Sequence, residues 1–314
     1  MTKIGIKKSL MASVFFGMLY FVSLAFFESI SYWQYLIVPI LLVNVNRMLY
    51  WVQYHTDFAK FSDRKTRGKQ ISIFTSVASL VAVFLPLISG QILENYDFRL
   101  LFMVGGFIFM MSIIPLFFLP DKKAVYSYGY IQSFKKLFSR QKRRMLLSFA
   151  ADGAQGAVGI AFWPLFIWLV LDKSYSAVGI VSSLIILFSI VVRLTVGDFS
   201  DRFNKKKMLK WGTSLYSIGW IVKMFVATGF QIFLASTYHA FAAIIMRTSY
   251  DSLMYDRAAD AGDMSDEYSV LREMALSVGR ILMILVVIVI FTFVGDITIA
   301  FMLAGLVSLL INLI

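Results

Sequence analysis

The amino-acid sequence predicts an all-α polytopic membrane protein with about ten transmembrane helices. Of its 314 residues, 59% are hydrophobic and only 15% are charged, which leaves too few charges to cover a water-soluble domain. The mean hydropathy is +0.77, far above that of a typical soluble protein. Apolar runs of about 20 residues, the length of a bilayer-spanning helix, recur along the whole chain.

These runs define ten predicted spans, arranged as a group of four and a group of six. We expect residues 1–120 to form the first bundle, 121–144 a basic cytoplasmic linker and 145–314 the second bundle. Aromatic residues in the linker also permit an amphipathic helix on the inner leaflet. The spans are residues 9–27, 33–53, 71–92, 100–119, 145–171, 176–196, 208–228, 230–250, 271–294 and 298–314.

The distribution of Lys and Arg predicts the orientation of the spans. Alternate gaps together hold 24 of these residues, whereas the opposite gaps hold only Arg99 and Lys173. Basic loops remain in the cytoplasm, so we expect both termini there and the chain in the cell membrane. The net charge of +12 resides in these short gaps, and not on a folded basic face, so we expect no nucleic-acid partner.

The sequence predicts no catalytic residues, no metal site and no cofactor. Cysteine is absent, which excludes disulfides and thiol chemistry. The two histidines, His55 and His239, are far apart in sequence and show no metal-ligand spacing. A glycine-rich nucleotide-binding loop is also missing, which argues against transport driven directly by ATP.

Polar side chains inside the spans are the candidate functional residues, because burying them in a bilayer is costly. The imidazole of His239 suits proton coupling. Arg193 and Arg280 lie near the cytoplasmic span ends, where a structural role is expected, and Lys223 is unassigned. Each candidate can also be a structural residue with satisfied hydrogen bonds. The substrate-cavity candidates are Asn44, Arg47, Tyr50, Trp51, Asp152, Gln155, Tyr238 and His239.

Two parts of the chain are similar at an offset of 199 or 200 residues. Residues 3–10 (KIGIKKSL) align with residues 202–209 (RFNKKKML), and each stretch leads directly into a span. Arg47 and Tyr50 align in the same way with Arg247 and Tyr250. Such parallel repeats are found in transporters built from two similar halves.

The stretch GDFSDRFNKK at 197–206 resembles the signature loop G-x-x-x-D-[RK]-x-G-[RK]-[RK] of the major facilitator superfamily. Asn204 replaces the second glycine of that pattern, and Gly5 occupies the same glycine in the N-terminal copy. The resemblance implies that these residues stabilise one conformation of the transporter, with Asp201 facing the helix that begins near Gln70. The signature-loop candidates are Gly5, Gly197, Asp201, Arg202, Lys205 and Lys206.

The resemblance also implies the architecture of two parallel six-helix halves, of which the first two helices are absent from this sequence. In that family the first and fourth helices of each half line a central cavity, which here gives spans 33–53, 145–171 and 230–250. Without the missing helices, Asn44, Asn46 and Arg47 would face lipid, so a second copy or a separate chain is an expected partner.

The sequence therefore favours a secondary transporter that moves a small solute by alternating access, with protons as a candidate coupling ion. Two alternatives stay open. One is a truncated remnant that does not transport alone, and the other, less favoured, is a membrane enzyme acting on lipids. The lipid bilayer is a partner in every case.

Overall fold

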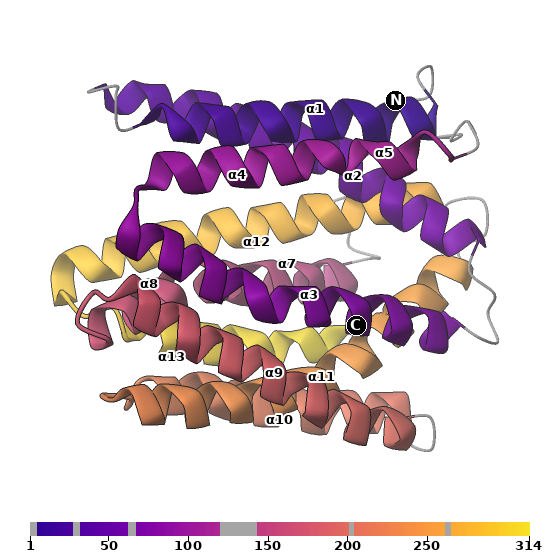
Figure 1. Cartoon of the computed structure of the whole chain (residues 1–314). Coiled ribbons are helices and arrows are strands. Elements are labelled where there is room, and N and C mark those ends of the chain that lie inside the picture. Colours follow the sequence, from indigo (N-terminus) through magenta and orange to yellow (C-terminus); the bar gives the residue numbers. More distant parts are fainter. Residues whose placement is uncertain (1–4, 28–31, 62–66, 120–142, 201–203, 261–264) are drawn as a thin grey trace.

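Every predicted span is helical in the structure, a computed structural model that describes residues 5–27, 32–61, 67–119, 143–200, 204–260 and 265–314. Within these ranges the regular secondary structure is entirely helical, so the predicted fold class is confirmed. Most helices run lengthwise along one common direction (Figure 1). Seven described segments are long and apolar enough to cross a membrane, whereas Ile299–Leu313 is shorter.

The helices follow the predicted order. Four of the described spans also contain a short non-α turn or a break, at Trp33–Leu36, Ser112, Val158–Phe162 and Leu309–Leu313. The first four spans are α1 (Ile6–Ala25), α2 (Ile37–Phe61), α3 (Arg67–Asn95) and α4 (Phe98–Met111) with α5 (Ile113–Leu116). The last six are α7 (Arg143–Ala157) with α8 (Trp163–Val170), α9 (Tyr175–Ser200), α10 (Lys205–Lys223), α11 (Gly229–Asp260), α12 (Ser265–Val294) and α13 (Ile299–Ser308). The linker predicted at 121–144 lies outside the described residues except for its last two, which begin α7.

One span is interrupted in a way that the sequence analysis did not anticipate. A π-helical turn, Val158–Phe162, separates α7 from α8. Pro164 lies in the first turn of α8 and lacks the N–H that a continuous α-helix would use. The wider turn accommodates this missing donor without breaking the span.

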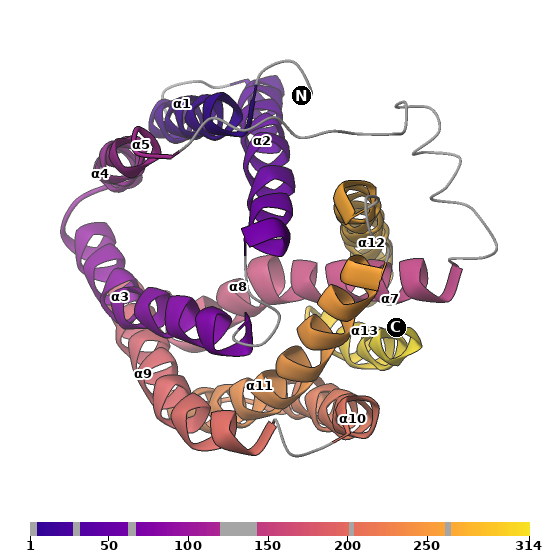
Figure 2. The same cartoon turned by 90° about the vertical axis from the view of Figure 1, so that its right-hand side faces the viewer.

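The main hydrophobic core lies in the last six spans. It contains the fully buried side chains of Phe149, Trp220 and Phe301, which come from α7, α10 and α13. In the first four spans, α1 packs against α2 and α4, while α3 packs mainly against α9. Figure 2 looks along the helices and shows α2 directed toward α12 and α11. Helix α2 contacts both α11 and α12, so it lies beside the second group of spans.

Close helix contacts depend on glycines at two crossings. A Cβ at Gly153 of α7 or at Gly279 of α12 would overlap the backbone carbonyl of Leu276 or Ala150 on the facing helix. At the α3–α9 crossing, a Cβ on Gly90 would lie 2.6 Å from the Tyr175 carbonyl oxygen. These helices therefore approach closely enough for backbone-to-backbone packing, as is common in membranes.

The first prediction compares two glycines of α7. Gly153→Ala should destabilise the protein by about 1–3 kcal/mol, because the added methyl group overlaps the backbone of α12. Gly156→Ala is the matched control, since a Cβ there meets nothing within 4 Å and alanine favours the helix. Thermal unfolding of the two purified variants in detergent measures the difference. Equal stability would contradict the close α7–α12 crossing.

Candidate functional site

A continuous series of polar and aromatic side chains crosses the second group of spans, between α7, α8, α10 and α11. It begins at an ion pair between α7 and the middle of α11, passes through an amide and a phenol, and ends at a buried lysine. We call it the polar array. Its members are Arg247, Asp152, Gln155, Tyr216, His239 and Lys223.

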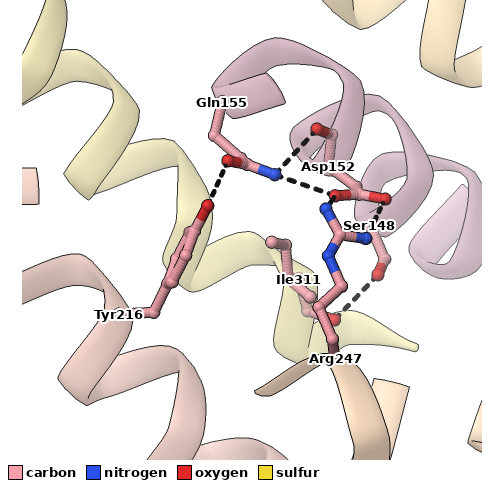
Figure 3. Close-up of polar contacts among 6 residues, drawn as sticks. All are labelled: Ser148, Asp152, Gln155, Tyr216, Arg247 and Ile311. Atoms are coloured by element: carbon pink, nitrogen blue, oxygen red, sulfur yellow. Dashed lines mark hydrogen bonds and ion pairs between the residues drawn. The ribbon is translucent and has the colours of Figure 1, made fainter. Parts of the chain in front are cut away.

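The ion pair joins α7 to α11. Asp152 is only 4% exposed, and the Arg247 guanidinium holds both of its carboxylate oxygens. The Nη1–Oδ2 distance is 2.8 Å, and Nη2 donates to Oδ1 (Figure 3). The Arg247 side chain is 38% exposed, so the pair lies at the edge of the helix group. A carboxylate buried at this depth requires such a partner.

Gln155 extends the ion pair to α10. Its amide nitrogen donates to Asp152 Oδ1 over 2.9 Å, and its amide oxygen accepts a hydrogen bond from the Tyr216 hydroxyl over 2.7 Å (Figure 3). One helical turn before Asp152 on α7, the Ser148 hydroxyl donates to the Ile311 carbonyl over 2.7 Å. The polar face of α7 is therefore hydrogen-bonded to α10, α11 and the end of the chain.

His239 follows Tyr216 in the array. Its ring centroid lies 4.2 Å from that of Tyr216 and 4.6 Å from that of Trp220, in edge-to-face geometry. The side chain is 5% exposed, and Nδ1 has no hydrogen-bond partner in the described part of the chain. The imidazole is therefore a buried, titratable group with an unused nitrogen.

Lys223, unassigned from sequence, is the last residue of α10 and ends the array. Its ammonium nitrogen lies 4.3 Å from the ring centroids of both Trp163 and Trp220. The residue is 5% exposed. Two indole faces thus provide the attraction that a carboxylate would otherwise supply to a buried cation.

The predicted residues of α2 lie outside the array. Asn44 is exposed and donates to the Ile40 carbonyl of its own helix over 2.7 Å. Arg47 is half-buried, and Tyr50 and Trp51 are 36% and 37% exposed with their rings in edge-to-face contact. These side chains form a second polar region, which lies on α2 in the first group of spans.

Two expectations from the sequence need correction, one for Asn46 and one for Arg247. Asn46, expected to face lipid, donates to the Ser13 carbonyl of α1 over 2.7 Å and is thereby satisfied. Arg247 is one of the 24 basic residues counted above in the cytoplasmic gaps, although it falls in the predicted span 230–250; it lies inside α11 and binds Asp152. Tyr238, beside His239, donates to the Leu215 carbonyl over 3.2 Å and is not part of the array.

The signature-loop candidates are only partly described. Asp201 and Arg202 lie outside the described residues, and Gly197 is within α9. Lys205 and Lys206 are exposed in the first turn of α10, where Asn204 Oδ1 accepts from the Lys206 and Lys207 amides over 3.0 and 3.3 Å. Gly5 precedes α1 with φ of 80°, a conformation that glycine adopts readily.

The sequence contained a signal for Arg247 that residue-by-residue reading missed. The internal repeat aligns Arg47 with Arg247, so the same position in each group of spans carries an arginine. Lys223 had no such signal, because its aromatic partners come from two different helices. No group of three metal-ligating side chains occurs among the described residues. The arrangement can hold buried charges, and the unused nitrogen of His239 can take up a proton.

Comparison with known proteins assigns most of the chain to one protein family. Residues 1–265 match the family model of the Major Facilitator Superfamily. The chain is 23% identical over 256 residues to the uncharacterized protein YqgE of Bacillus subtilis (strain 168), and this match covers 77% of the chain. It covers 58% of YqgE, so the chain spans less than two thirds of that relative's length.

Two solved structures share the fold at 14% sequence identity. One is FucP, described as a Major Facilitator Superfamily transporter in the outward conformation, with a TM-score of 0.65. The other is a single-substitution variant of the E. coli fucose:proton symporter FucP, with a TM-score of 0.66. Each comparison covers 99% of this chain and 83% of the FucP chain.

The second prediction concerns the ion pair. Arg247→Gln should cost about 3–5 kcal/mol of stability, because it leaves the Asp152 carboxylate buried without a counter-charge. Asp152→Asn should cost less, since the arginine that it leaves is partly exposed. The double variant should be more stable than Arg247→Gln alone. Unfolding in detergent micelles measures all three.

Arg257→Gln is the control for this cycle, because Arg257 is an exposed charge on the same helix. Its effect should stay within about 0.5 kcal/mol. Strictly additive effects of the two ion-pair substitutions would show that Asp152 and Arg247 do not stabilise each other.

Proposed function

Because this chain belongs to the Major Facilitator Superfamily of multi-pass membrane transporters, we propose that it moves a small solute by alternating access. The family match over residues 1–265 is the observation that carries this proposal. Residues 1–120 and 145–314 would be the two halves that rock against each other. We propose that this is secondary transport, with the solute bound between the halves.

The helix contacts support two different roles at the boundary between the halves. The α3–α9 crossing has backbone-to-backbone contacts, since a Cβ on Gly179 would lie 2.5 Å from the Pro86 carbonyl oxygen. Such a close crossing suits a pivot. The α2–α12 and α2–α11 contacts involve helices with half-buried arginines, which suits the solute site.

His239 is the proposed proton carrier if transport is proton-coupled. It is buried, its Nδ1 has no partner among the described residues, and the polar array connects it through Tyr216 and Gln155 to Asp152. Protonation of His239 would add a second buried cation near Lys223. This repulsion would link the protonation state to the packing of α10 and α11.

We further propose that both termini face the cytoplasm of a cell membrane. The helix ends that flank the basic gaps, including the starts of α1, α7 and α12, lie at one end of the molecule (Figure 1). A single orientation therefore satisfies the positive-inside rule for all these gaps.

Helices beyond those of this sequence are proposed to complete the first half. They would cover Asn44 of α2, whose exposure to hydrocarbon would be unfavourable. A longer form of the chain, a second copy or a separate polypeptide could supply them. We expect a reconstituted monomer of these 314 residues to show no saturable uptake until such helices are added.

The third prediction tests the orientation. The chain has no cysteine, so Tyr96→Cys and Lys207→Cys each introduce a single thiol at an exposed position. An impermeant thiol reagent added to intact cells should label position 96 but not 207. Membrane permeabilisation should make position 207 reactive, and labelling of 207 in intact cells would reverse the topology.

The fourth prediction tests transport in proteoliposomes that contain the completed assembly. Arg47→Gln, Asp152→Asn and His239→Asn should each reduce solute uptake about tenfold or more, the loss expected when 1.4 kcal/mol of binding is removed. Arg257→Gln should leave it unchanged. Gel filtration checks that each variant is folded. Full uptake by all three site variants would show that the solute binds elsewhere.

A further inference from the structure

The start of α9 is held by two side chains from the other half of the molecule. It lies beside the end of α3, at the end of the molecule opposite the basic gaps, which we propose to be the outer end (Figure 1). The Glu94 carboxylate on α3 accepts a hydrogen bond from the Ser176 backbone N–H, with Oε2 3.1 Å from the nitrogen. The Gln91 amide nitrogen donates to the Ser176 hydroxyl over 3.0 Å.

The cap at the start of α9 would be incomplete without Glu94. The first amides of a helix have no acceptor within the helix itself. Ser174 supplies a local cap, because its hydroxyl accepts from the Ala177 N–H over 3.2 Å. The Ser176 N–H is left over, and Glu94 accepts it. The start of a helix carries partial positive charge, so a carboxylate is a favoured acceptor there. Glu94 makes no ion pair with any described residue, which leaves the helix end as its positive partner.

The contact lies at the edge of the close α3–α9 crossing. Pro86 faces Gly179 and Gly90 faces Tyr175, so the two helices run antiparallel, and both views show them side by side (Figures 1 and 2). Phe98, the first residue of α4, adds an edge-to-face ring contact with Tyr175 at 5.7 Å. Because the backbones already touch, the helices cannot move closer, and a change of crossing angle is the motion that remains.

Hydrogen bonds respond sharply to such a change. The bond from Ser176 to Glu94 is 3.1 Å long and is lost once its atoms separate by about a further 0.5 Å. Gln91 and Glu94 are both exposed, so water can replace their partner when the bond breaks. The contact can therefore open and close without leaving a buried charge unpaired.

We propose that Glu94, supported by Gln91, is a latch that holds the outer ends of the two halves together in one conformation of the transport cycle. This inference rests on the proposed alternating access and adds residues that set its conformational balance. The latch is closed in the conformation described here. Rotation of the halves about the crossing breaks it and exposes the first turn of α9 to water. Neither residue belongs to the signature-loop stretch at 197–206 or to its N-terminal copy at 3–10.

The first experiment measures the separation of the halves without any solute. Because the chain has no cysteine, Tyr96→Cys and Ala227→Cys place one spin label at an exposed position of each half. In lipid nanodiscs, Glu94→Gln should raise the population with the longer label separation about 2- to 5-fold, the effect of one charge at a helix N-terminus. Glu94→Ala should raise it further, since it also removes the acceptor.

Asp97→Asn is the matched control. Asp97 lies three residues after Glu94 and also caps a helix, but its partner is the Leu100 N–H of α4 in its own half, over 2.7 Å. Removing this charge should leave the label separation unchanged. An equal shift in Asp97→Asn, or no shift in Glu94→Ala, would overturn the latch.

Hydrogen exchange distinguishes a latch from a local helix cap. The Ser176 amide should exchange faster in Glu94→Ala than in the unaltered chain, and Asp97→Asn should not change it. Faster exchange with unchanged label separation would show that Glu94 only stabilises α9, which overturns the latch. A shifted separation supports the latch even if the completed assembly gives no uptake. Saturable uptake with an unshifted separation in Glu94→Ala overturns the latch and leaves the transport proposal standing.

Discussion

The packing of the last six spans depends on the requirement that buried charges be paired. Asp152 is buried on α7, where an unpaired carboxylate would be very unfavourable, and Arg247 of α11 meets this requirement through both of its oxygens. Gln155 and Tyr216 then connect the pair to α10. This network specifies how three helices are rotated about their axes, which apolar contacts alone specify poorly.

Glycines meet the other requirement, which is close approach of the helices. Lipid chains are as apolar as leucine, so the hydrophobic effect adds little to helix association inside a bilayer. At Gly153 and Gly279 the α7 and α12 backbones come too close for any side chain. The same helix α7 therefore combines a polar face that bonds to α10 and α11 with a small-residue face that packs on α12.

Much of the fold could be predicted from the sequence, because span length, hydropathy and the positions of Lys and Arg are local properties. All ten predicted spans are helical in the described residues, and Asp152, Gln155 and His239 became candidates because they are polar residues within these spans. The partnership of Asp152 with Arg247 was missed because Arg247 was counted with the cytoplasmic basic residues, although it falls in the predicted span 230–250 and the repeat with Arg47 indicated its position. The placement of Lys223 against two indole rings depends on tertiary packing, which no local pattern encodes.

The sequence separation within the ion pair has a consequence for biosynthesis. Asp152 and Arg247 are 95 residues apart, and the chain is made at about 5–20 residues per second, so α7 leaves the ribosome roughly 5–20 s before its partner. During that interval the aspartate has no Arg247 to bind, at an insertion cost of about 2.5–3.5 kcal/mol at mid-bilayer. The apolar α8 that follows in the same span, with Trp163, Phe166 and Ile167, offsets this cost. Insertion of the fifth span therefore depends on its second half, and its final packing waits for the eighth.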